Sequence, residues 1–301
     1  MTVPADRGVP QDTDRAAVLV TVDELAADLR LSGTDPADGA PVLLDVRWAL
    51  GQTDGQERYL AGHLPGAAYV DLETELAAPA SPQAGRHPLP SAAQLQGAAR
   101  RWGVRAGSRV VVYDAVGGTS AARAWWLLRY FGVKDVRLLD GGLDAWAARG
   151  LPLEVGEVVP ERGDVVVRPG HLPVLDADEA AEVAADGVLL DARAAERYRG
   201  EVEPVDPRAG HVPGALSAPT TENLGADRTF LPTAALRERF AALGVRPGAG
   251  RPVGVYCGSG VTASHEVLAL AAVGVTAALY TGSWSQWSAD PSRPAATGAR
   301  P

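Results

Sequence analysis

Residues 43–47 read Leu-Leu-Asp-Val-Arg, and residues 189–193 repeat them as Leu-Leu-Asp-Ala-Arg. Further along, the turn Gly-His-Leu-Pro-Gly-Ala at 62–67 returns as Gly-His-Val-Pro-Gly-Ala at 210–215. The landmarks keep their order in both halves, and the repeat is too long for a solenoid. The chain therefore contains a duplicated domain.

Within each copy, short apolar runs alternate with longer helical patterns. The run at 110–113 has the composition of a strand, and residues 120–131 and 261–272 have the length and the apolar faces of helices. This alternation favours an α/β fold with two tandem units, each a mostly parallel sheet flanked by helices. We expect a first unit at 15–152, a proline-bearing linker at 153–172 and a second unit at 173–292.

The composition excludes several classes of protein. The 301 residues are 46% hydrophobic and 22% charged, and the chain has no apolar run long enough to cross a membrane. A net charge of −9 gives no basic footprint for nucleic acid. The five histidines and one cysteine lack the paired spacing of a zinc site. A single cysteine and an N-terminal stretch without leader features predict a cytoplasmic protein.

Cys257 is the only cysteine, and it stands where a predicted strand ends and a predicted helix begins. Gly258 and Gly260 allow the backbone to curl around the sulfur, so that amide N–H groups and the start of the helix favour an anion there. Such surroundings produce a reactive thiolate that can carry a persulfide. The alternative is a small buried hydrophobic residue, which is how most lone cysteines behave.

The first copy has Asp114 at the place of Cys257, so only the second unit can perform thiol chemistry. A cysteine phosphatase also uses a strand, a curled loop and a helix, but it needs an arginine six residues after the cysteine. Ala263 occupies that position, which disfavours a phosphatase.

From about residue 18 to residue 290 the chain resembles the tandem rhodanese-domain sulfurtransferases. Its loop Cys-Gly-Ser-Gly-Val-Thr at 257–262 is similar to that of the 3-mercaptopyruvate sulfurtransferases, whereas thiosulfate sulfurtransferases have basic residues directly after the cysteine. The resemblance implies an inactive first domain and a catalytic second one. It also implies that the substrate site is lined by the loop residues that follow the nucleophile, which are Gly258, Gly260, Val261 and Thr262.

The same resemblance implies roles for residues outside the loop. Arg197 and Arg208 would bind the carboxylate and keto oxygen of the substrate, although two more residues separate them than in the animal enzymes; alternatively, both are solvated or paired with nearby carboxylates. Ser259 would assist proton transfer together with His63 and Asp54. Because His63 and His211 occupy the same turn in the two copies, a structural role for both is the competing interpretation.

These observations predict an enzyme in which the Cys257 thiolate takes sulfur from 3-mercaptopyruvate and passes it to a thiol such as thioredoxin, or to cyanide. Neither step needs a metal or an organic cofactor, and no nucleic acid or membrane partner is expected. Two alternatives remain open: a thiosulfate sulfurtransferase, and a noncatalytic protein that carries a persulfide received from a partner.

Overall fold

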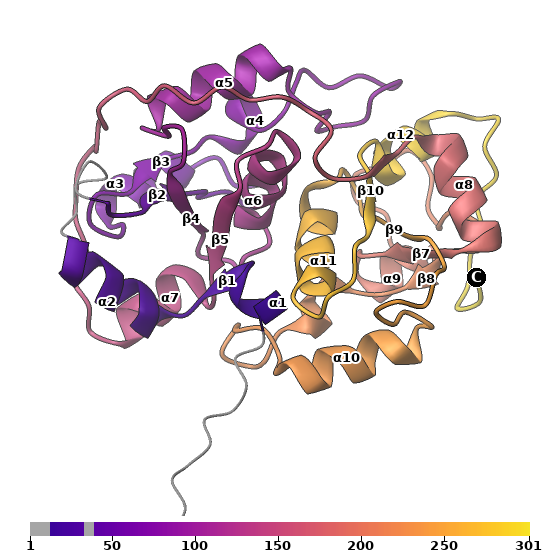
Figure 1. The fold of residues 1–301 in the computed structure, drawn as a ribbon. Helices are drawn as coiled ribbons and strands as arrows, with labels where there is room; N and C mark the ends of the chain where they lie inside the picture. Colours follow the sequence, from indigo (N-terminus) through magenta and orange to yellow (C-terminus); the bar gives the residue numbers. More distant parts are fainter. Residues whose placement is uncertain (1–12, 33–38) are drawn as a thin grey trace, which may run out of the picture.

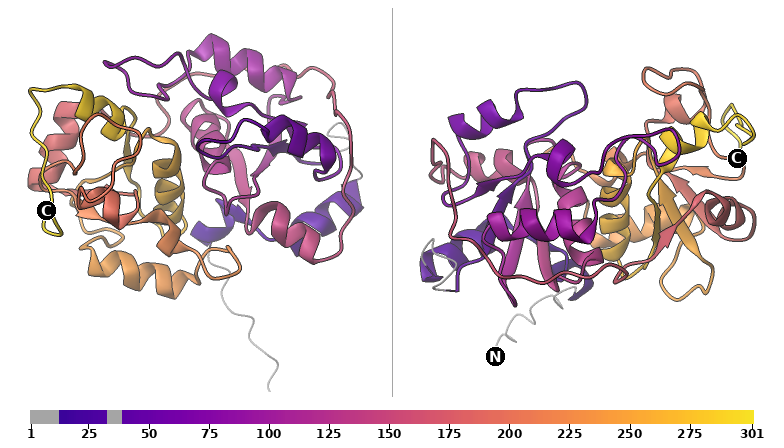
Figure 2. Two further views of the ribbon diagram at one scale, coloured as in Figure 1. Left: turned by 180° about the vertical axis from the view of Figure 1, so that it is seen from behind. Right: turned by 90° about the horizontal axis from the view of Figure 1, so that it is seen from above.

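The computed structural model describes residues 13–32 and 39–301, which form two α/β units joined by a linker. The two units lie side by side (Figures 1 and 2). Each contains a five-stranded sheet whose paired strands run parallel. The predicted architecture of two mostly parallel sheets flanked by helices is confirmed.

The first sheet has the strand order β1-β5-β4-β2-β3. Its strands are β1 (Leu19–Val20), β2 (Val42–Asp45), β3 (Ala68–Tyr69), β4 (Arg109–Tyr113) and β5 (Asp135–Leu139). The helices of this unit are α1 (Thr13–Ala16), α2 (Val22–Ser32), α3 (Gly55–Ala61), α4 (Leu72–Glu75), α5 (Ala92–Arg101), α6 (Ala121–Tyr130) and α7 (Gly142–Ala148). Every residue of β2 is buried, which explains its continuous apolar sequence, since helices cover both faces of the sheet.

The second sheet repeats this topology in the order β6-β10-β9-β7-β8. Its strands are β6 (Val174–Leu175), β7 (Val188–Asp191), β8 (Leu216–Ser217), β9 (Val253–Tyr256) and β10 (Ala278–Tyr280). The helices are α8 (Ala177–Asp186), α9 (Ala195–Tyr198), the 3-10 helix η2 (Thr220–Asn223), α10 (Thr233–Ala242), α11 (Val261–Ala271) and α12 (Ser283–Ala289). The two sheets are thus internal copies of one another.

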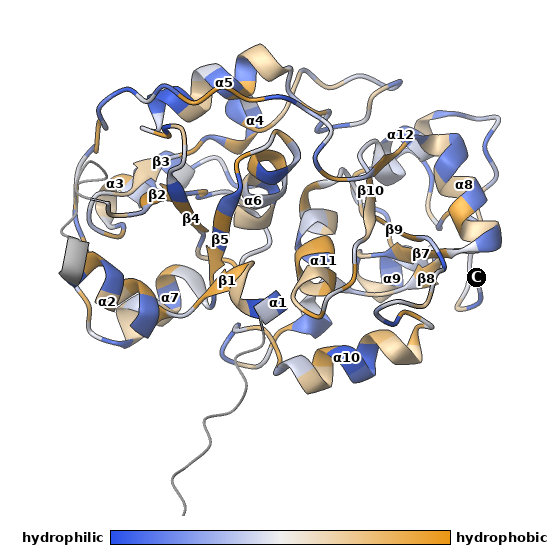
Figure 3. Ribbon diagram, viewed as in Figure 1, coloured by the Kyte–Doolittle hydropathy of each residue, from blue (hydrophilic) through white to orange (hydrophobic). Residues whose placement is uncertain are grey.

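The units meet along α6 and α11, which face each other at the centre of the molecule (Figure 1). One hydrophobic cluster includes residues of both helices, among them Trp126 and Leu268. Apolar residues gather on β5 and α11, whereas the outer helix α10 includes polar ones (Figure 3). Because each of the two central helices directly follows one of the two duplicated loops, this packing brings both loops close to the domain interface.

The linker follows the surface of the first unit in an extended conformation (Figure 1). The amide of Gly163 donates to the carbonyl of Arg100 at 2.8 Å, and that of Arg168 donates to the carbonyl of Phe131 at 2.9 Å. Val165 and Val167 are buried between these points. Within the described part of the chain, no helix combines the length and apolarity needed to span a membrane.

Candidate active site

Cys257 occupies the tight connection between β9 and α11. Its Sγ accepts a hydrogen bond from the amide of Gly260 at 3.1 Å, and Gly260 has a left-handed φ of 81°. The loop is held from the opposite side by the start of α12, where the amides of Trp284 and Ser285 donate to the carbonyls of Cys257 and Gly258, both at 2.9 Å. The sulfur is therefore fixed beside the positive end of α11, where a thiolate is favoured over a neutral thiol.

The matching loop of the first unit shows that this architecture accommodates an anion. The Asp114 carboxylate accepts hydrogen bonds from four backbone amides at 2.8 to 2.9 Å, those of Val116, Gly118, Ser120 and Ala121. Burial raises the pKa of Asp114, and the four amides act in the opposite direction. Asp114 thus fills its own loop with a permanent acidic group and leaves no nucleophile there.

Ser259 lies at the end of a chain of hydrogen bonds that begins in the first unit. Its Oγ is 2.7 Å from Nδ1 of His87, and Nε2 of His87 is 3.2 Å from a carboxylate oxygen of Glu73. Trp48 orients Glu73 by donating from Nε1 to the carboxylate at 2.7 Å. Burial lowers the pKa of His87, while the adjacent Glu73 raises it. The arrangement can pass a proton between Ser259 and the surface.

The relay predicted through His63 and Asp54 requires correction, because His87 rather than His63 contacts Ser259. The His63 ring stacks on Tyr59 at 4.1 Å, and its Nδ1 lies 2.9 Å from the carbonyl of Tyr59. His211 repeats both contacts with Tyr198 in the second unit, at 3.7 Å and 2.8 Å. Asp54 pairs with Arg58 at the surface. The repeated turn histidines therefore share a structural role.

Two guanidinium groups stand over the cysteine loop. A Cβ atom on Gly258 would lie 2.8 Å from Nη2 of Arg86 and 3.4 Å from Nη1 of Arg197, so a side chain at this position would collide with both. Both arginines pair with the carboxylate of Asp206, and Arg197 also contacts Glu203 at 2.6 Å. Arg197 thus lies beside the loop, as the sequence predicted, and is joined there by an arginine of the first unit.

Arg208 lies elsewhere, and its expected position at the substrate requires correction. Its guanidinium donates to four backbone carbonyls at 2.7 to 2.9 Å, those of Trp287, Ser288, Asp290 and Arg293. Its own carbonyl accepts from the indole of Trp284 at 2.9 Å. The end of α12 leaves carbonyls without helical partners, and Arg208 supplies their donors.

Arg123 of α6 crosses the domain interface and is fully buried. Its guanidinium donates to the carbonyls of His87 at 2.9 Å and Gly260 at 3.4 Å, so that it joins the proton relay to the cysteine loop. Burial lowers its pKa to about 10, and the nearby Cys257 opposes this shift. The side chain therefore places a positive charge close to the sulfur.

Glu73, Arg86, His87 and Arg123 were not predicted from the sequence. One signal could have identified His87: the pair Leu89-Pro90 repeats at Leu231-Pro232, and Thr229 stands at the place that corresponds to His87. A histidine present in only one copy is a better catalytic candidate than one in a turn that both copies need. No comparable signal distinguishes Arg86 or Arg123 from the other arginines.

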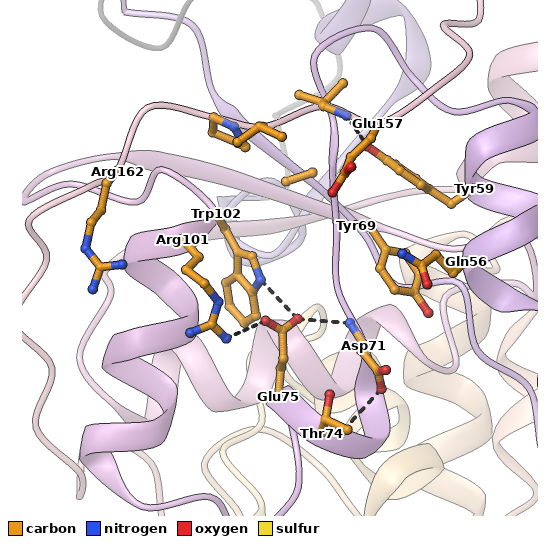
Figure 4. A pocket seen from close by; sticks show the side chains of 14 residues that line it. Gln56, Tyr59, Tyr69, Asp71, Thr74, Glu75, Arg101, Trp102, Glu157 and Arg162 are labelled. Atoms are coloured by element: carbon orange, nitrogen blue, oxygen red, sulfur yellow. Dashed lines mark hydrogen bonds and ion pairs between the residues drawn. The ribbon is translucent and has the colours of Figure 1, made fainter.

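A separate hollow of about 650 Å³ lies on the first unit, between α4, α5 and the linker (Figure 4). Its central carboxylate, Glu75, accepts hydrogen bonds from Arg101, Trp102 and the amide of Asp71. Cys257 is not among the residues that line this hollow. The reactive groups are instead gathered at the domain interface.

A nucleophilic cysteine in a strand-to-helix loop, within a duplicated parallel α/β unit, is the arrangement of a sulfur-carrying enzyme. The model of the rhodanese-like domain matches residues 25–149 and 176–290, and the chain belongs to the rhodanese family in its tandem form. It is 49% identical over 292 residues to a Pseudomonas aeruginosa protein named as a 3-mercaptopyruvate sulfurtransferase, a match that covers 94% of this chain and 99% of the relative.

Other relatives agree on the class of enzyme but differ in the donor that they are named for. SseB of Mycobacterium tuberculosis, named as a thiosulfate sulfurtransferase, is 48% identical over 94% of this chain and 98% of its own length. The crystal structure of the 3-mercaptopyruvate enzyme SseA from Escherichia coli matches with a TM-score of 0.76 and 34% identity, covering 88% of this chain and 98% of SseA. The chain is accordingly a sulfurtransferase.

Proposed function

We propose that this enzyme transfers sulfur from 3-mercaptopyruvate, through a persulfide on Cys257, to a thiol acceptor. The observation that carries the proposal is the hydrogen-bonded chain from Glu73 through His87 to Ser259, two residues from the nucleophile. A keto acid has a carbonyl oxygen that this chain can polarise, whereas thiosulfate has none. The 3-mercaptopyruvate enzymes among the relatives support the same donor.

In the first step, the Cys257 thiolate attacks the sulfur of 3-mercaptopyruvate and forms an S–S bond. The carbon–sulfur bond of the donor breaks, and its electron pair moves into the three-carbon fragment as an enolate. The Ser259 hydroxyl donates a hydrogen bond to the developing enolate oxygen, backed by His87 and Glu73. Protonation at carbon releases pyruvate and leaves Cys257 as a persulfide.

The donor carboxylate is held by the two guanidinium groups over Gly258, those of Arg86 and Arg197. A guanidinium binds a carboxylate through two directed N–H donors, which fixes the direction in which the donor sulfur points. Because Arg86 belongs to the first unit and Arg197 to the second, closure of the substrate site depends on both domains.

In the second step, a thiolate attacks the terminal sulfur of the persulfide and restores the Cys257 thiolate. We propose a small thiol or thioredoxin as the acceptor, with cyanide serving in an assay. A catalytic cycle that passes through a free thiolate suits a reducing compartment, and we propose the cytoplasm.

Thiosulfate is the second candidate donor, because two arginines above the loop provide positive charge for a dianion. A noncatalytic persulfide carrier is the third possibility. Both differ from the proposal in their dependence on the relay: neither requires a proton donor aimed at a keto oxygen.

The test is steady-state sulfur transfer to a thiol and to cyanide, with 3-mercaptopyruvate and thiosulfate compared under the same conditions. We expect a higher kcat/KM for 3-mercaptopyruvate, and mass spectrometry should show a gain of one sulfur on Cys257 when the acceptor is omitted. Cys257→Ser should abolish both signals. Preference for thiosulfate would reject the proposed donor, and turnover in Cys257→Ser would reject the persulfide mechanism.

A further inference from the structure

A buried carboxylate links the two arginines over the cysteine loop. One oxygen of Asp206 contacts Nη1 of Arg86, and the other lies 3.2 Å from Nη2 of Arg197. The side chain of Asp206 is only 3% exposed. Its backbone amide donates to Glu203 at 3.0 Å, which fixes the turn that carries it. Asp206 therefore holds both guanidinium groups from one side.

The opposite side of each guanidinium is turned toward the sulfur loop. Arg86 uses Nη1 for Asp206 and places Nη2 over Gly258, whereas Arg197 uses Nη2 for Asp206 and places Nη1 over Gly258. The Nε atoms of both arginines are buried without a hydrogen-bond partner. Each arginine thus keeps donors that an incoming anion can use, in a direction that Asp206 determines.

The charges in this ion-paired network cancel. Arg193 bridges Asp191 at 2.6 Å and Glu203 at 3.4 Å, and Glu203 continues the network to Arg197. The network contains three cations and three carboxylates, which are Arg86, Arg193 and Arg197 with Asp191, Glu203 and Asp206. A donor that binds here therefore meets directed N–H groups but little net positive charge from the network.

We propose that Asp206 is a specificity-determining residue, whose buried negative charge makes the site prefer a singly charged donor over doubly charged thiosulfate. This inference rests on the proposed function. The two donors differ by one unit of negative charge, and in a partly buried site that difference interacts strongly with a carboxylate a few ångströms away. Asp206 acts through Arg86 and Arg197, and it is not itself a catalytic residue.

The decisive variant is Asp206→Asn, which keeps the shape of the side chain and removes its charge. We expect the ratio of kcat/KM for thiosulfate to that for 3-mercaptopyruvate to rise about tenfold. Glu201→Gln is the matched control: it removes one carboxylate from the same segment, but this carboxylate is exposed and pairs with Arg199. The donor ratio should not change in the control.

Arg86→Gln provides a test of opposite sign and does not depend on the folding of Asp206→Asn. Removal of this cation leaves Asp206 with less compensation, so the donor ratio should fall below that of the wild-type enzyme. Asp206→Glu should restore the wild-type ratio at least in part, because it returns the charge.

Alkylation of Cys257 tests the same charge without sulfur transfer. Iodoacetate is an anion and iodoacetamide is a neutral molecule of similar size, so the ratio of their rates reports the electrostatic potential at the sulfur. Asp206→Asn should raise this ratio, Arg86→Gln should lower it, and Glu201→Gln should leave it unchanged.

Donor and alkylation ratios that shift together, with opposite signs in the two variants, would support the inference. Unchanged ratios in Asp206→Asn, or equal shifts in Glu201→Gln, would overturn it, as would an altered alkylation ratio without an altered donor ratio. If the wild-type enzyme used neither donor, the proposed function would fail, and with it the donor preference. The alkylation ratio would then show separately whether the Asp206 charge acts on the sulfur.

Discussion

His87 lies between a hydroxyl and a carboxylate, with Ser259 on one side and Glu73 on the other. Burial is the largest influence on its pKa and lowers it, whereas Glu73 raises it. The ring is therefore mostly neutral at pH 7 and can both accept and donate a proton. This ability distinguishes it from His63, whose ring is stacked on a tyrosine and bonded to a backbone carbonyl.

We expect His87→Ala to lower kcat with 3-mercaptopyruvate by about a hundredfold, because positioned proton transfer contributes at least that much in typical enzymes. Alkylation of Cys257 by iodoacetamide should continue, since the nucleophile stays in place. His171→Ala is the control, because it removes an exposed histidine. A variant His87→Ala with the wild-type kcat would contradict the relay.

The pH profile of Glu73→Gln gives a test with a defined sign. Removing a carboxylate that raises the pKa of His87 should lower that pKa further. Because the relay needs neutral His87, activity is lost as the pH falls through this pKa, and the acid limb of kcat should move to lower pH in the variant. An acid limb that stayed in place would show that His87 does not control it.

At the scale of the elements, the loop between β9 and α11 depends on Gly260. Its φ of 81° is unfavourable for other residues, and a Cβ atom there would lie 2.9 Å from the carbonyl oxygen of Thr281. Gly244 has a similar φ of 78° but open space around its Cβ position. The pair separates backbone strain from collision.

We expect Gly244→Ala to cost about 1 kcal/mol of unfolding free energy, through the backbone alone. Gly260→Ala should cost roughly 3 kcal/mol, because the collision with Thr281 adds to the strain. The midpoints of thermal unfolding of the two variants would measure this difference. Equal losses would mean that the loop shifts to accommodate the methyl group.

The elements themselves could be predicted because their signals are local. The apolar strands, the glycines of the loop and the duplicated turns all repeat within each half of the sequence. Half of the site could not be predicted, because His87 and Ser259 are 172 positions apart and meet only through the packing of α6 against α11. Arg208 was assigned to the substrate by its spacing from Arg197, but the carbonyls at the end of α12 bind it instead.

At the scale of the whole molecule, the two domains contribute different parts of one site. The second domain supplies Cys257 and Arg197, and the first supplies His87, Arg86 and the interface residue Arg123. The first domain is therefore required for the reaction although its own loop lacks a thiol.

A thiol moved to the first domain should not restore activity. In the double variant Asp114→Cys with Cys257→Ser, the new cysteine would have neither the arginine pair nor the relay beside it, since both face the other loop. We expect no sulfur transfer from 3-mercaptopyruvate, and Asp114→Cys alone should retain turnover at Cys257. Turnover in the double variant would show that the loop alone suffices.

Asp114 also explains how one fold serves two purposes within the chain. Its carboxylate supplies the first domain with an anion that never leaves, so this loop keeps the same hydrogen bonds throughout the reaction. The charge and size of the group at Cys257 change at every turnover. Duplication has thus produced a division of labour, in which one copy acts as a fixed template and the other handles the cargo.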